Sequence, residues 1–214
     1  MKLSTALKTV GLLACFAASP LVSAKALEVK TQAGTVAVKT IAEGLQNIWG
    51  MAFLPDGRLL VTERPGRMRI VTLDGKVGEP LTGLPAIHAQ GQGGLLDVVL
   101  APDFATSKRI YFSYAEPGEG GNSTAVSYAT LGDGKLENVT RIFSQQPKVE
   151  SNGHFGSRLV WAPDGTLFVT LGERYSEKDK AQLLDNHQGK VIRINADGSV
   201  PADNPYVIVE QLGF

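Results

Sequence analysis

Residues 49–62 read Trp-Gly-Met-Ala-Phe-Leu-Pro-Asp-Gly-Arg-Leu-Leu-Val-Thr: an apolar run, a Pro-Asp-Gly turn and a second apolar run. Proline presets the backbone for a turn, aspartate bonds the amides that follow it, and glycine accepts a positive φ. Apolar runs on both sides of such a turn indicate a β-hairpin. This stretch therefore predicts two antiparallel strands.

The same pattern returns twice further along the chain. Residues 95–114 carry it around Pro102 and Asp103, and residues 158–170 carry it around Pro163 and Asp164. Copies about 50 residues apart are typical of blade-type β-propellers. We therefore expect an all-β fold, a β-propeller of four-stranded antiparallel blades, with about three to four blades in this sequence. Because so few blades would not close a larger ring, we expect the propeller to be incomplete.

Alternating apolar and polar residues predict further strands outside the three hairpins. An N-terminal hairpin is expected over residues 27–38, and single strands over residues 67–73, 124–131, 140–144 and 189–195. Long loops are expected over residues 83–94 and 145–156, a glycine-rich loop over residues 116–122, and a short helix within residues 173–188.

The charge balance argues against nucleic acid as a partner. Lys and Arg together number 21, as do Asp and Glu, so the formal net charge of the 214 residues is zero. No basic stripe stands out, so the electrostatic footprint of a nucleic-acid-binding protein is missing. The 24 glycines suit a turn-rich β protein.

The N-terminus is typical of a secretory signal. Lysines precede an apolar stretch at residues 10–18, and Val-Ser-Ala at residues 22–24 fits a cleavage site. We expect a signal peptide over residues 1–24 and a propeller domain over residues 25–214. The apolar stretch is too short to span a bilayer, so we expect a periplasmic protein. A lipoprotein anchor at Cys15 is the alternative.

One glycine-rich loop directly precedes the second hairpin, and another directly precedes the third. Gln92 lies in the first loop and His154 in the second, and glycines beside both let the backbone approach a ligand closely. His154 is the best candidate for a general base, because an imidazole accepts a proton near neutral pH. A loop histidine that bonds nearby backbone is the alternative. Glu63 and Glu173 follow outgoing strands and have no assigned role.

The sequence indicates no histidine metal site, serine nucleophile or nucleotide-phosphate loop. No two histidines have metal-ligand spacing, and neither a G-x-S-x-G elbow nor a Walker A loop occurs. His88 and His187 are interpreted as structural, and Asp56, Asp103 and Asp164 as turn formers.

The motifs resemble those of the soluble pyrroloquinoline-quinone (PQQ)-dependent aldose sugar dehydrogenases, the glucose/sorbosone dehydrogenase family. Residues 49–64 are similar to that family's first blade. Later signatures are matched by residues 91–104, 154–159 and 189–205. The likeness runs from Ile41 to Pro205 in four ordered motifs.

The resemblance implies a six-bladed quinoprotein that oxidises the C1 hydroxyl of aldose sugars to lactones. His154 would take the hydroxyl proton as hydride passes from C1 to PQQ. Gln92 would face substrate and cofactor, and Gln182 would be a second cofactor-binding residue. The resemblance also implies Ca²⁺ and a periplasmic electron acceptor, and it leaves a homodimer open.

Two departures from the family pattern bear on this site. Gly153 stands where well-known glucose dehydrogenases carry an aspartate, so an orienting carboxylate must come from elsewhere or the base strength differs. The family's cations for the cofactor carboxylates and its calcium ligands correspond to positions beyond residue 214. We therefore expect the 214-residue chain as written to bind the quinone poorly and to be inactive.

Two other classes of protein stay open. A non-catalytic binding module of the NHL or YWTD propeller type would have no need for His154 and Gln92 on one face. A propeller hydrolase such as a lactonase would point calcium-binding Asp, Asn and Glu side chains into the channel, and the sequence shows no such cluster.

Overall fold

The computed structural model describes residues 27–206. The chain divides into two compact units, Met1–Thr40 and Ile41–Phe214. The described part of the first unit is a hairpin of β1 (Leu27–Thr31) and β2 (Gly34–Val38), as the sequence alternation predicted. The predicted signal peptide and Cys15 lie outside the described residues.

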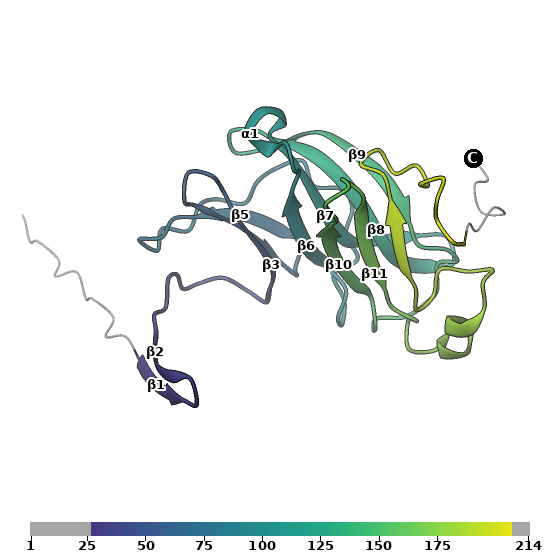
Figure 1. Ribbon diagram of the computed structural model, residues 1–214, viewed down its shortest axis with the longest axis horizontal. Coiled ribbons are helices and arrows are strands. Elements are labelled where there is room, and N and C mark those ends of the chain that lie inside the picture. The colour runs from purple at the N-terminus through teal and green to yellow at the C-terminus, as the bar shows by residue number, and fades with distance from the viewer. Residues whose placement is uncertain (1–26, 207–214) are drawn as a thin grey trace, which may run out of the picture. The chain divides into compact units, whose positions relative to one another are not determined.

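Over residues 41–206 the second unit contains three antiparallel sheets in chain order, here called blades 1, 2 and 3 (Figure 1). Blade 1 contains β3 (Ile48–Phe53), β4 (Leu59–Glu63) and β5 (Arg67–Val71). Blade 2 contains β6 (Leu95–Leu100), β7 (Arg109–Gly118), β8 (Gly121–Leu131) and β9 (Leu136–Ser144). Blade 3 contains β10 (Gly156–Trp161), β11 (Leu167–Leu171) and β12 (Val191–Ile194). Two short helices, α1 (Phe104–Ser107) and η1 (Lys178–Gln182), lie in connections.

The three repeated sequence patterns form the hairpins β3–β4, β6–β7 and β10–β11, as predicted. Their aspartates hold the turns. The Asp56 carboxylate accepts a hydrogen bond from the backbone amide of Arg58 at 3.1 Å, and the Asp164 carboxylate accepts one from Thr166 at 3.0 Å. The interpretation of Asp56 and Asp164 as turn formers is confirmed, whereas Asp103 precedes the short helix α1 and caps no backbone amide with its side chain.

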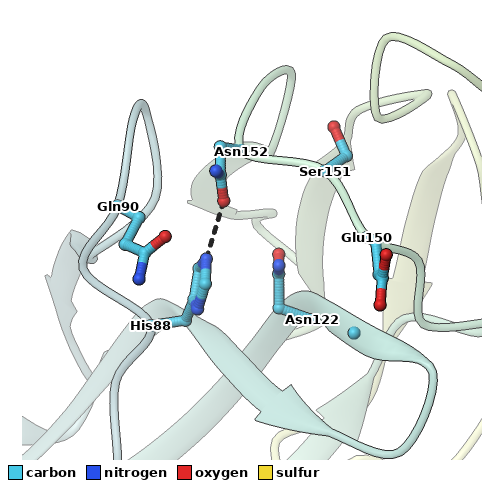
Figure 2. A pocket seen from close by; sticks show the side chains of 7 residues that line it. His88, Gln90, Asn122, Glu150, Ser151 and Asn152 are labelled. Atoms are coloured by element: carbon cyan, nitrogen blue, oxygen red, sulfur yellow. Dashed lines mark hydrogen bonds between the residues drawn. The ribbon is translucent and has the colours of Figure 1, made fainter.

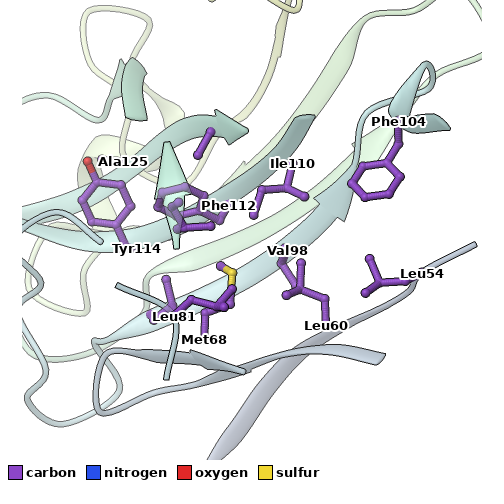
Figure 3. Packing of buried hydrophobic residues seen from close by; sticks show 13 residues of the cluster. Leu54, Leu60, Met68, Leu81, Val98, Phe104, Ile110, Phe112, Tyr114 and Ala125 are labelled. Atoms are coloured by element: carbon purple, nitrogen blue, oxygen red, sulfur yellow. The ribbon is translucent and has the colours of Figure 1, made fainter. Parts of the chain in front are cut away.

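Apolar side chains join neighbouring blades face to face. Between blades 1 and 2, Leu60 and Met68 share a core with Phe112 (Figure 3). Between blades 2 and 3, a second core includes Tyr111 and Leu159. Each fully buried side chain of this size contributes about 1.5–3 kcal/mol. This stacking of antiparallel sheets is that of a β-propeller, so the expected fold class is confirmed.

Only blade 2 has four strands within the described residues. After β5 the chain makes isolated bridges, Val71 to Val77 and Thr82 to Lys135, and passes Pro80 and Pro85. Proline lacks the N–H that a ladder needs, which explains why this segment adds no strand. In blade 3, a turn closed by Gly198 follows β12.

The prediction of a loop over residues 116–122 is wrong. β7 continues to Gly118 and β8 begins at Gly121, so only two residues connect them. Gly120 and Gly121 have φ of 79° and 128°, backbone conformations that let the chain reverse tightly. Glycine content therefore signalled a hairpin turn here rather than an open loop.

Hydrogen bonds between blades 2 and 3 fix the position of β6 relative to β10 along the strand direction. The buried Asp97 carboxylate on β6 accepts hydrogen bonds from the Leu159 amide at 2.8 Å and from Arg158 Nη1 at 2.9 Å. Ser113 Oγ donates to the Ser157 carbonyl at 2.7 Å. These bonds align the starts of β6 and β10 and thus the loops that precede them. Across residues 27–206, neither helix has the length and apolar character that crossing a bilayer requires.

Candidate active site

The two glycine-rich loops meet at one end of blades 2 and 3. The Gln92 backbone amide donates to the Asn152 carbonyl at 2.8 Å, and the His154 backbone amide donates to Gln92 Oε1 at 2.8 Å. Gly91 has a φ of 58°, and a Cβ there would lie 2.6 Å from the Asn152 carbonyl. The structure therefore brings Gln92 and His154 together, and the glycine allows the approach.

The His154 imidazole is held by a carboxylate from the next loop. Nδ1 of His154 hydrogen-bonds to Oε1 of Glu173, which follows β11. This hydrogen bond holds the pKa of Glu173 below its ordinary value, so the carboxylate is charged at neutral pH. A carboxylate can only accept, so Nδ1 of the neutral ring carries the hydrogen and Nε2 keeps its lone pair. The Tyr175 ring packs edge-on against the imidazole, with centroids 5.2 Å apart.

The free edge of His154 is open to a ligand. The side chain is 42% exposed, and within residues 27–206 its Nε2 has no hydrogen-bond partner. A neutral imidazole with one nitrogen fixed by a carboxylate and the other accessible is the arrangement of a general base. Glu173, whose role the sequence left undecided, therefore supplies an orienting carboxylate that Gly153 does not.

Backbone strain gathers at these loops. His154, Arg174 and Tyr175 have φ of 48°, 60° and 64°, the left-handed region that side chains other than glycine rarely occupy. Such residues cost about 1–3 kcal/mol each and persist only where surrounding contacts hold them. Here the Arg174 amide donates to the His154 carbonyl at 3.3 Å. A Cβ on Gly172 would lie 1.6 Å from that same oxygen, so the two loops are packed backbone to backbone.

Arg174 is the main support of the His154 loop. Its side chain is fully buried, and burial lowers its pKa to about 10. Nε donates to the Gly153 carbonyl at 3.1 Å, and Nη2 donates to the Ser151 carbonyl at 2.5 Å. Nη1 and Nη2 also donate to the carbonyl and side-chain oxygens of Asn122 at 2.7 and 2.6 Å. The guanidinium lies 3.9 Å from the centre of the Phe155 ring.

Sequence reasoning did not find Arg174. In the sequence it is one cation in a polar loop, and its acceptors lie 21 to 52 residues away along the chain. No local motif marks it. Its burial, which only the packing of two blades creates, distinguishes it from a surface arginine.

Gln182 is not brought to the same place by any described contact. It is the last residue of η1, its side chain is exposed, and within residues 27–206 it forms no hydrogen bond to His154 or Gln92. Its predicted part in cofactor binding stays a prediction.

The remaining candidate residues have structural surroundings. Burial alone would raise the pKa of Glu63, but hydrogen bonds from Arg67, the Gln46 amide and Arg69 outweigh it and lower the pKa to about 2. His187 is largely buried against Phe143 and accepts a hydrogen bond from the Gln146 amide at 3.0 Å. Within the described ranges, no group of three or more His, Cys, Asp or Glu side chains is placed to hold a metal ion.

Stacked antiparallel blades define a β-propeller, and the loops at one end of blades 2 and 3 bring an imidazole and a carboxylate together. The family model described as Glucose / Sorbosone dehydrogenase matches residues 45–212, and the chain belongs to that family. The resemblance in the sequence motifs is therefore confirmed.

Individual relatives agree with this assignment. The aldose sugar dehydrogenase YliI of Escherichia coli (strain K12) is 45% identical over 177 residues, covering 81% of this chain and 47% of that protein. A solved glucose dehydrogenase aligns with a TM-score of 0.75 and 48% identity, over 82% of this chain and 55% of its own. The PQQ-bound aldose sugar dehydrogenase of Streptomyces coelicolor aligns with a TM-score of 0.70 and 27% identity, over 78% of this chain and 50% of its own. The chain spans about half the length of the curated relatives that it matches.

Proposed function

We propose that this chain carries the proton-abstracting half of a periplasmic quinoprotein that oxidises the C1 hydroxyl of aldose sugars to lactones. The observation that carries the proposal is the contact between His154 Nδ1 and Glu173, beside Gln92. Support also comes from relatives described as aldose sugar and glucose dehydrogenases, one of them PQQ-bound.

The described residues can carry out the transfer of the C1 hydroxyl proton. Nε2 of His154 accepts the proton of the C1 hydroxyl, which avoids an unstable protonated carbonyl as the hydride leaves C1. Glu173 stabilises the imidazolium that forms, and the Gln92 side chain holds the His154 backbone in place. Bound PQQ would supply the acceptor for the hydride. The C1–H and O–H bonds break, and a C1 carbonyl forms.

The described residues fit this proton transfer better than they fit the anchoring of the cofactor. PQQ carries three carboxylates, whose natural partners are cations. The guanidinium of Arg174 is buried and donates to loop oxygens. Arg64 packs against Gly94, two residues after Gln92, and forms no ion pair within residues 27–206. Calcium, the periplasmic acceptor and a homodimer stay predictions from the resemblance.

A non-catalytic propeller module is the competing proposal, and the pairing of His154 with Glu173 beside Gln92 supports the enzyme over it. The test is dye reduction with glucose by the chain extended to the length of its relatives and supplied with PQQ and calcium. We expect His154→Ala to lower kcat by about 10²- to 10⁴-fold. The matched control Glu43→Ala, an exposed acid on another loop, should leave the rate unchanged. Equal rates in the parent and His154→Ala would refute the proposed base.

A further inference from the structure

Residues 152 and 153 form the one Asn-Gly pair in the 214-residue sequence. The backbone nitrogen of a residue can attack the side-chain amide of an asparagine that precedes it. Glycine hinders this attack least, because it has no side chain. The pair lies in the loop before β10, outside helices and strands, and Asn152 is exposed. Sequence and exposure therefore point to a site of deamidation beside the His154 loop.

The fold places a hydrogen-bond donor at the side-chain carbonyl of Asn152. Nε2 of His88 donates to Oδ1 of Asn152 at 2.8 Å, along the dashed line in Figure 2. A carbonyl oxygen can only accept, so the hydrogen of this bond lies on Nε2. When a nucleophile adds to Cγ, negative charge develops on Oδ1, and a donor already in place stabilises it. His88 therefore activates this side chain toward attack.

The attacking nitrogen of Gly153 is held only weakly. Within residues 27–206 its amide forms one hydrogen bond, to Oγ of Ser151 at 3.3 Å, which is longer than a usual N–H···O bond. A Cβ on Gly153 would meet nothing closer than Gln92 Oε1 at 3.8 Å. The backbone at Gly153 therefore has room for the local rotation that brings its nitrogen to Cγ of Asn152.

We propose that Asn152 deamidates in the folded protein, with His88 as the activating donor. The nitrogen of Gly153 forms a bond to Cγ of Asn152, the bond from Cγ to Nδ2 breaks, and the proton of the Gly153 nitrogen leaves with Nδ2 as ammonia. Water then opens the cyclic imide at either carbonyl, which yields aspartate or isoaspartate. Water is the only co-reactant. Because the nitrogen attacks after it loses its proton, the reaction is faster at higher pH.

The product alters the loop that presents His154. Both products add a negative charge at residue 152, and isoaspartate also adds a methylene to the backbone. In isoaspartate the carbonyl of residue 152, which accepts the Gln92 amide at 2.8 Å, becomes a free carboxylate. The lengthened backbone also shifts the Gly153 carbonyl, which accepts from Arg174 Nε at 3.1 Å. Deamidation therefore loosens contacts that hold the two loops together.

Peptide mapping by mass spectrometry, on the purified protein kept folded at mildly alkaline pH, measures the conversion. We expect aspartate and isoaspartate to accumulate at residue 152, with ammonia released in equal amount. Asn122 is the internal control, because a small serine follows it in the sequence. Its side chain is buried and its Oδ1 accepts from Arg174 Nη2 at 2.6 Å, so it should stay unchanged.

Three variants separate the effect of the fold from that of the Asn-Gly pair. His88→Leu removes the donor, whereas His88→Gln keeps an N–H group there. In the folded state we expect His88→Leu to slow conversion about tenfold or more, and His88→Gln to slow it much less. In urea, the parent and both His88 variants should convert at one rate. Gly153→Ala should be slower in both states, because a side chain hinders the nitrogen. Circular dichroism checks that each variant folds.

Faster conversion of the folded parent than of folded His88→Leu, with the difference lost in urea, would support the inference. Equal rates in the folded parent and folded His88→Leu would overturn it. It would also be overturned if Asn152 stayed intact in the folded protein while the protein in urea converted. Neither failure bears on the proposed base, because deamidation uses no atom of His154 or Glu173.

Discussion

Replacing Arg174 with methionine tests whether one buried cation holds the loop that presents His154. The change removes donors from three backbone carbonyls and from Asn122 Oδ1. Hydrogen bonds to a charged group contribute about 1.5–3 kcal/mol each, but they are not additive, and methionine avoids the cost of burying a charge. A buried acceptor left without its donor costs about 1–3 kcal/mol, so with four acceptors that are not additive we expect a loss of unfolding free energy of about 3–5 kcal/mol.

Urea unfolding of the purified protein, followed by the fluorescence of Trp49 and Trp161, measures this loss. The matched control is Arg58→Met, because Arg58 pairs with Asp56 at 2.6 Å on the surface, where the side chains are 46% and 51% exposed. Such an exposed pair contributes little to stability, because water and salt screen it. In the Arg174 variant we also expect faster amide hydrogen exchange across residues 151–155 under native conditions.

A small loss of unfolding free energy in Arg174→Met would refute this reasoning. If Arg174→Met loses no more stability than Arg58→Met, the guanidinium does not support the loop. The same holds if amide exchange over residues 151–155 is unchanged, because the strained φ of His154 would then be held by other contacts.

Three further predictions follow from the same structure. Burial lowers the pKa of His187 to about 4 from an ordinary 6.5, so the unfolded chain binds a proton that the folded chain refuses. Stability should therefore fall as pH drops through this window, by roughly 2 kcal/mol between pH 7 and pH 5 in urea titrations, and His187→Gln should flatten the profile. Gly153→Asp should cost less than about 1 kcal/mol by thermal unfolding, because a Cβ there meets nothing closer than Gln92 Oε1 at 3.8 Å. Gly172→Ala, 1.6 Å from the His154 carbonyl, should cost far more, and equal melting temperatures would contradict the packing of the two loops. In the extended, PQQ-loaded enzyme, Glu173→Gln should lower kcat about tenfold or more with KM nearly unchanged, and a change confined to KM would assign Glu173 to binding.

The hairpins could be predicted because their signals are local. A Pro-Asp-Gly turn is fixed by bonds within a few residues, as the Asp56 and Asp164 contacts confirm. The loop predicted over residues 116–122 failed for the same kind of reason. Glycine permits both an open loop and a tight reversal, and only the pairing of β7 with β8 decides between them.

The candidate site could be predicted only in part. Parallel glycine-rich loops were enough to place Gln92 beside the His154 backbone. Glu173 could not be chosen over Glu63, since the sequence pattern put both just after an outgoing strand, although the structure makes Glu63 the last residue of β4. Their partners differ, with two arginines beside Glu63 and an imidazole beside Glu173, and these partners are set by how the blades pack.

The central claim is that Glu173 fixes the His154 ring with Nε2 as its free base. Long-range ¹H–¹⁵N NMR, which shows which nitrogen of a neutral imidazole carries the hydrogen, tests it most directly. We predict that the His154 hydrogen resides on Nδ1, and that Glu173→Ala moves it to Nε2. A hydrogen found on Nε2 of the unaltered protein would contradict the claim, because that nitrogen could not then accept a proton from a sugar.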